Sequence, residues 1–93
     1  MRDERFEALA HPIRQRVLLA LRGDGEGEVT LAIPDDVADE GDADRLHLEL
    51  YHVHLPRLQS AGFVAWDSTG GTVGRGARFD EVEPLLDALV GTR

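Results

Sequence analysis

The chain has 93 residues, a length that suits one domain with a single small core. It contains no cysteine, which excludes a disulfide framework and a thiolate metal site, and it has no apolar run of the roughly 20 residues that a membrane span requires. The acidic start MRDERFEALA lacks the apolar centre of a signal peptide, so we expect a cytoplasmic protein that does not enter membranes.

The charge is unusual in sign and in composition. Eighteen acids against ten bases give a formal net charge of −8, every base is arginine, and lysine is absent. An acidic chain is at first sight a poor ligand for nucleic acid, since phosphate neutralisation supplies most sequence-independent affinity. However, abundant acids without lysine resemble the proteins of haloarchaea, whose cytoplasm is rich in salt. The Debye length there falls to about 3 Å, so acidity stops arguing against DNA binding.

The first half of the chain predicts helices around one short strand. A helix is expected from Arg2 to Ala10, and Pro12 suits the first position of a second helix that runs to Arg22. Residues 23–27 form a glycine-rich loop, and Glu28–Ile33 form a short strand. Pro34 then opens a short helix over one or two turns, followed by a turn at residues 41–44 with Asp42 or Asp44 as the next N-cap.

A longer helix is predicted from Arg45 onwards. At 100° per residue its core face carries His47, Leu48, Tyr51, Leu55 and Leu58, and the opposite face carries Leu46, Leu50, Val53 and Arg57. Because Pro56 removes one helical hydrogen bond, a kink or break is expected between His52 and Leu55.

The second half predicts a hairpin and a last helix. Gly62 stands where a helix end favours positive φ, and strands Phe63–Trp66 and Thr72–Gly74 flank a loop over residues 67–71. The segment 80–90 is an amphipathic helix whose apolar residues are Val82, Leu85, Leu86, Leu89 and Val90.

Two stretches carry a family resemblance. His54–Val64 (HLPRLQSAGFV) resembles the recognition helix and wing of winged helix-turn-helix repressors of the ArsR-like type, and Ala8–Leu18 (ALAHPIRQRVL) resembles their first-helix signature. The resemblance implies an α+β fold: a single winged helix-turn-helix domain over residues 1–93, with its core at about 5–76 and an added C-terminal helix at about 80–90. It further implies a DNA-binding transcriptional regulator of the small haloarchaeal type, with its recognition helix in the major groove of double-stranded DNA.

Under this resemblance the DNA-binding residues are expected on the recognition helix and the wing. Base edges are read in the major groove, while wings commonly meet the phosphate backbone. The expected set is Arg45, Glu49, His52, Arg57, Arg75 and Arg78. Arg14 and Arg16, on the outer face of the second helix, could also touch the backbone.

A surplus of apolar side chains predicts a homodimer. The stripe Leu46, Leu50 and Val53 and the C-terminal helix together exceed what one small core absorbs, and two-fold pairing would bury the excess. The expected interface residues are Phe6, Leu9, Leu85, Leu86 and Leu89. The competing expectation is a monomer whose C-terminal helix folds back over the stripe.

Other functions remain open at this point. The principal alternative is a winged-helix module that binds a protein partner and never DNA. A metal-responsive regulator is a weaker one, because His52 and His54 lie roughly 200° apart on a regular helix, although a kink at Pro56 could bring them and His47 together. We predict no enzyme activity, no cofactor and no metal, since Ser60 and Ser68 lie in no nucleophile motif and no phosphate-binding loop is present.

Overall fold

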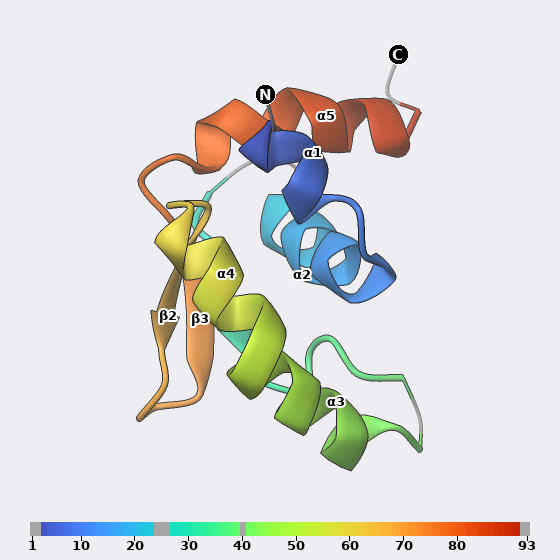
Figure 1. The fold of residues 1–93 in the computed structure, drawn as a ribbon, viewed down its shortest axis with the longest axis vertical. Coiled ribbons are helices and arrows are strands. Elements are labelled where there is room, and N and C mark those ends of the chain that lie inside the picture. Colours follow the sequence, from blue (N-terminus) through green and yellow to red (C-terminus); the bar gives the residue numbers. More distant parts are fainter. Residues whose placement is uncertain (1–2, 24–26, 40, 92–93) are drawn as a thin grey trace.

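The computed structural model describes residues 3–23, 27–39 and 41–91. It is an α+β structure in which helices pack around a small antiparallel sheet (Figure 1). The elements follow in the order α1 (Glu4–Ala8), α2 (Pro12–Arg22), β1 (Leu31–Ala32), α3 (Ala43–Glu49), η1 (Leu50–His54), α4 (Leu55–Ser60), β2 (Val64–Asp67), β3 (Thr72–Arg75) and α5 (Phe79–Leu89).

Side-chain caps define the first two helices. The Asp3 carboxylate accepts from the Arg5 N–H at 2.9 Å and starts α1. His11 caps α2 in the same way, because its Nδ1 accepts from the Ile13 N–H at 3.1 Å, and Pro12 occupies the first turn as expected. Gly23, with a φ of 56°, ends α2. Of the loop predicted at 23–27, residues 24–26 lie outside the described part of the chain, as does Arg2 of the first predicted helix.

The sheet has the order β1-β3-β2, and both pairings are antiparallel. β2 and β3 form the predicted hairpin, whereas β1 pairs over two residues only, Leu31 with Val73 and Ala32 with Thr72. The short helix predicted after Pro34 is wrong: residues 33–37 form a hydrogen-bonded turn. The Asp36 carboxylate accepts from the Ala32 N–H at 2.8 Å, a local bond that competes with helix formation.

The segments α3, η1 and α4 run as one continuous helix past α2 and the hairpin (Figure 1). The break expected near Pro56 is a π-helical turn over Leu50–His54, in which the Leu55 N–H donates to the Leu50 carbonyl. Pro56 has no N–H to continue the ordinary ladder, so the turn is widened rather than interrupted.

The π turn also reverses the predicted faces of this helix. Four side chains spaced four residues apart are buried, Leu46, Leu50, His54 and Leu58. In a regular α-helix, side chains four residues apart are rotated by about 40° from one another around the helix axis. The wider π turn offsets this rotation, so all four side chains lie on one side of the helix. The prediction that Leu46 and Leu50 face away from the core is therefore wrong, and so is the burial predicted for His47 and Leu48, which are exposed.

The core lies between α2, the long helix, the sheet and α5. Its largest fully buried members include Phe63, Leu18, Leu21, Leu50 and Leu86. Gly62, at a φ of 88°, ends α4 as predicted and turns the chain so that Phe63 enters this core. None of the described helices is long and apolar enough to cross a membrane.

Candidate functional site

The arginines of the described chain divide by whether an acid accompanies them. Five have a carboxylate oxygen within 4.0 Å: Arg5, Arg16, Arg22, Arg45 and Arg78. Arg14, Arg57 and Arg75 have no carboxylate at that distance among the described residues. In a chain of net charge −8, such side chains are the natural candidates for an external anion.

Arg75 is occupied inside the fold. Its Nε donates to the Leu21 carbonyl at 2.8 Å and its Nη2 to the Arg22 carbonyl at 2.9 Å, so it satisfies carbonyls that the end of α2 leaves without helical partners. Its guanidinium also lies 5.2 Å from the centre of the Phe79 ring. The expected role of Arg75 on a DNA-facing wing stays a prediction that this geometry does not support, because the side chain turns inward.

Arg78 is likewise held by its own chain. Its guanidinium pairs with Glu81 at 2.9 Å and with Glu4 at 3.1 Å, and it donates to the Ala61 carbonyl at 2.8 Å. Hydrogen bonds to the two carboxylates raise the pKa of Arg78. It joins α1, the end of α4 and α5, and the sequence-based assignment of this residue to a phosphate contact is not supported by this geometry.

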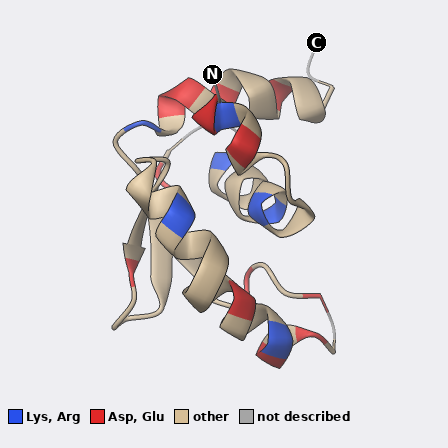
Figure 2. Ribbon diagram, viewed as in Figure 1, with Lys and Arg blue, Asp and Glu red and all other residues tan. Residues whose placement is uncertain are grey.

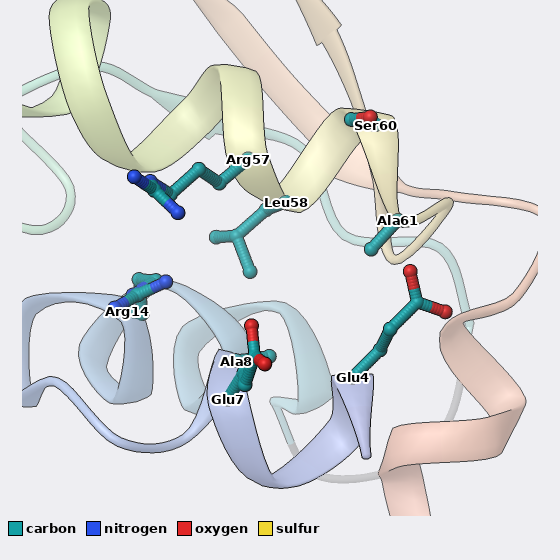
Figure 3. Close-up of a pocket in the computed structure, with 8 residues that line it drawn as sticks. All are labelled: Glu4, Glu7, Ala8, Arg14, Arg57, Leu58, Ser60 and Ala61. Atoms are coloured by element: carbon teal, nitrogen blue, oxygen red, sulfur yellow. The ribbon is translucent and has the colours of Figure 1, made fainter. Parts of the chain in front are cut away.

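Arg14 and Arg57 meet at one end of a cavity of about 210 Å³ between α4 and the first two helices. Figure 3 shows the two guanidinium groups pointing toward each other, Arg14 from α2 and Arg57 from α4, with Leu58 beside them. The Nε of Arg14 is buried without a hydrogen-bond partner in the described chain. Burial lowers the pKa of Arg14, and the charge of Arg57 lowers it further.

Two like charges lining one cavity, one of them with an unpartnered Nε, could together bind an anion. Planar guanidinium groups can each donate two parallel hydrogen bonds to a phosphate or carboxylate, and an anion between them would relieve their repulsion. The lining is not uniformly basic, because Glu4 and Glu7 border the same cavity (Figure 3). In Figure 2 the facing stretches of α2 and α4 carry basic positions, while acidic positions gather on α1 and the first turns of α5.

The remaining predicted DNA-binding residues lie on the long helix. The side chain of Arg45 is 79% exposed and only loosely paired with Glu49, at 3.9 Å. His52 is exposed on the π turn. Glu49 is half-buried and lies between His54 and Arg45, because its Oε1 is 3.9 Å from the Nε2 of the buried His54 while its Oε2 is 3.9 Å from exposed Arg45.

The predicted interface residues separate into three kinds. Leu86 is fully buried in the core, so its assignment to a dimer contact is wrong: α5 packs this residue against α2 and the rest of the core. Leu9 and Leu85 are half-buried against the same core. Phe6 and Leu89 stay outside, 60% and 51% exposed.

His11, which the metal hypothesis did not include, lies beside His54. The imidazole rings of His11 and His54 have centroids 4.4 Å apart, and Glu49 adjoins them. His52 and His54, which the metal hypothesis paired, differ instead in environment, because His54 is buried and His52 is exposed. Nothing local in the sequence announces the approach of His11, which depends on the packing of α2 against η1.

Arg14 and Arg57 carry a signal that sequence reasoning did not use. On a helix, acids three or four residues away are the usual partners of an arginine, as Glu49 is for Arg45 and Glu81 for Arg78. Neither Arg14 nor Arg57 has an acid at these spacings. This criterion narrows the choice without singling out the pair, because Arg5 and Arg16 also lack acids at these spacings and pair with Asp3 and Asp39 instead.

No curated protein and no solved structure matches this chain. A family model does match, over residues 6–74, which span α1 to most of β3 and include Arg14, Arg57 and the histidine cluster. Because this match covers well over half of the sequence, the chain belongs to the family described as Domain of unknown function (DUF7344).

Proposed function

We propose that this protein is a DNA-binding transcriptional regulator with a winged helix-turn-helix fold, similar to the ArsR-like repressors and adapted to a salt-rich cytoplasm. The order of elements supports the fold assignment: a helix, a short strand, a long helix and a hairpin whose second strand lies in the middle of the sheet. In this proposal the segments α3, η1 and α4 form the recognition helix and β2–β3 form the wing.

The observation that carries the proposal is the pair Arg14 and Arg57, which line one cavity and have no carboxylate within 4.0 Å in the described chain, although the charge of Glu7 acts on Arg14. A DNA phosphate is an anion of suitable size and charge for two guanidinium groups. The pair replaces Arg75 and Arg78 as the backbone contact, since those two are bonded within the fold. One phosphate held at the junction of α2 and α4 would fix the orientation of the long helix on the duplex.

The outer face of the long helix would then read bases. Arg45 and His52 are exposed there, and Gln59 is exposed on α4 near Arg57. Arginine pairs well with guanine and glutamine with adenine in the major groove. Glu49 leaves the proposed base-reading set because it faces His54.

The proposed assembly is a homodimer through the α1 and α5 edge. α1 packs against α5, and the exposed apolar residues there are Phe6, Leu89 and Val90 (Figure 1). Sedimentation in molar KCl is expected to give a dimer that Leu89→Glu converts to a monomer. Val53→Glu, an equally exposed apolar site on the long helix, is the matched control and should leave the dimer intact. A wild-type monomer at micromolar concentration would remove the two-fold arrangement.

Binding to a pool of random duplex DNA, followed by selection and sequencing, tests the function. Arg14→Gln and Arg57→Gln should weaken binding to all sequences alike, whereas Arg45→Gln and His52→Ala should change the selected sequence. Arg16→Gln is the control, since Arg16 lies on the same helix but pairs with Asp39 at 3.2 Å. Absence of any DNA binding by the folded wild type would contradict the proposal.

That negative result would favour the protein-interaction module. The observation on its side is the exposure of Leu48 (61%) and Val53 (44%) on the long helix, since apolar side chains on an outer helix face are typical of protein contacts.

A further inference from the structure

Two histidines and a glutamate converge beneath the π turn. One ligand atom from each of His11, Glu49 and His54 lies within 4.8 Å of the other two. His11 comes from the start of α2, while Glu49 and His54 lie at the two ends of the π-helical turn. Separate elements thus bring three metal-binding side chains to one point, and the cluster lies beside the cavity of Arg14 and Arg57 rather than in it.

His54 is the unexplained member of this group. Its residue is only 3% exposed, its Nδ1 is buried without a hydrogen-bond partner, and its Nε2 is 3.9 Å from Glu49, too far for a hydrogen bond. A buried imidazole without hydrogen bonds is costly, and in the described chain nothing else satisfies it.

The surroundings of His54 disfavour its protonated form. Burial lowers the pKa of His54, and the neighbouring His11 and Arg14 lower it further, against the opposing effect of Glu49. A neutral imidazole with a free lone pair is the ligand form.

We propose that His11, Glu49 and His54 form a binding site for a divalent transition-metal ion of the zinc class. Two imidazole nitrogens and one carboxylate oxygen are a donor set that suits Zn²⁺, whereas Ca²⁺ and Mg²⁺ prefer oxygen donors alone. Metal–ligand bonds of about 2.0–2.2 Å bring the ligand atoms of a tetrahedral site to roughly 3.5 Å from one another. The described separations are within a small side-chain movement of that geometry. The fourth position would hold water.

Coordination has a consequence at the start of α2. The Nδ1 lone pair of His11 accepts from the Ile13 N–H, and a neutral imidazole has one lone pair only. Metal binding therefore removes the hydrogen bond that caps α2. If Nε2 of His11 binds the metal, Nδ1 carries the proton and can no longer accept. If Nδ1 binds the metal, the Ile13 N–H is displaced from it. In both cases the Ile13 amide loses its acceptor, so its resonance reports on occupancy of the site.

The site also connects two elements that the proposed function uses, but the inference stands without DNA. An ion held by His11 from α2 and by His54 from η1 would pin the long helix against α2 beside Arg14 and Arg57. The experiment uses the metal alone, so failure of zinc binding and failure of DNA binding are separate results.

Titration calorimetry of the full, untagged chain with zinc nitrate tests the site. The buffer should contain molar potassium nitrate, because chloride competes for zinc. We expect saturable binding of one ion per chain. His11→Asn, which keeps an N-capping residue, and Glu49→Gln should each weaken binding by about tenfold or more. His52→Asn, on the same turn but exposed, is the matched control and should bind like the wild type.

Circular dichroism of each variant establishes whether it is folded. A third variant, His54→Gln, changes a buried residue and is the one most at risk of not folding. His11 and Glu49 are only half-buried, so their variants test the site even if His54→Gln does not fold. Nitrogen–proton correlation spectra should show the Ile13 amide shifting on zinc addition. Absence of saturable binding by the wild type would overturn the proposal. So would a His11→Asn variant that binds as tightly as the wild type, or equal losses in His52→Asn.

Discussion

Replacement of Arg75 by methionine should destabilise the fold strongly although the residue lies at the end of a surface hairpin. Its guanidinium donates to the carbonyls of Leu21 and Arg22 at 2.8 and 2.9 Å. Hydrogen bonds of a charged donor contribute about 1.5–3 kcal/mol each, and the half-buried setting places these two toward the lower end. The contact with the Phe79 ring adds about 0.5–1 kcal/mol.

The sum, about 3.5–4 kcal/mol, is a large part of the total stability. A domain of 93 residues has an unfolding free energy of roughly 5–14 kcal/mol at the usual value per residue. Urea unfolding in molar KCl, followed by the fluorescence of Trp66 and by circular dichroism, measures the difference. Arg45→Met is the control, since its exposed, loosely paired side chain should change stability by less than about 0.5 kcal/mol.

Arg75→Lys sharpens the comparison. Lysine keeps the charge but cannot donate from two fixed positions, so it should recover only part of the loss. If Arg75→Met were as stable as Arg45→Met, the inward role of Arg75 would be wrong, and a surface role on the wing would return.

Three further predictions concern the helix break, pH and salt. Leu50 is fully buried in the π turn, so Leu50→Ala should lower the unfolding free energy by about 2–5 kcal/mol. Leu48 is exposed two residues earlier, so Leu48→Ala should change it by less than about 0.5 kcal/mol. Equal effects of the two variants in urea unfolding would refute the assigned faces. Hydrogen bonds from Arg78 lower the pKa of Glu81 in the folded state below its ordinary value, so the pair stabilises the fold above the ordinary pKa and this contribution is lost as the pH falls through the lowered pKa. Arg78→Met should therefore flatten the decline in unfolding free energy measured between about pH 5 and 3. An unchanged decline would contradict the pairing. Because eighteen acids repel one another when unscreened, the melting temperature should rise steeply from dilute buffer to molar KCl, and a melting temperature indifferent to salt would count against adaptation to a salt-rich cytoplasm.

Patterns with local causes could be predicted from the sequence. The start of α2 at Pro12, the end of α4 at Gly62 and the β2–β3 hairpin each follow from residues within a few positions of the feature. The last helix was expected at 80–90 and lies at Phe79–Leu89. In these cases conformational preference and hydrophobic spacing agree with the tertiary packing.

The faces of the long helix could not be predicted because one turn changes the period. A projection aligned on Leu55 and Leu58 assumes a rotation of 100° per residue throughout the helix. The π turn at Leu50–His54 rotates less per residue, so the projection places Leu46 and Leu50 on the wrong side. Pro56 predicted an irregularity in the helix but not that it would be a π-helical turn. The surplus apolar stripe that favoured a large dimer interface was in part a product of this error, because Leu46 and Leu50 are buried and of the stripe itself Val53 alone is exposed.

The roles of the arginines depended on contacts far apart in sequence. Arg75 reaches carbonyls more than fifty positions earlier, and Arg78 reaches Glu4 at the other end of the chain. No local pattern separates such side chains from free ones on a wing. The absence of acids at helical spacing from Arg14 and Arg57 was visible in the sequence, and it is the feature that the proposed DNA contact uses.

The salt dependence of duplex DNA binding tests the central claim most directly. The logarithm of the binding constant falls linearly with the logarithm of salt concentration, with a slope of about −0.9 for each phosphate contact. The binding is measured by fluorescence anisotropy over a KCl series in which the protein stays folded. Because the pair is proposed to hold one phosphate, the double variant Arg14→Gln/Arg57→Gln should show a slope shallower by roughly one unit per protomer than the wild type, while Arg16→Gln keeps the wild-type slope. A double variant that binds DNA with the wild-type affinity and slope would contradict the assignment of Arg14 and Arg57 to the DNA backbone.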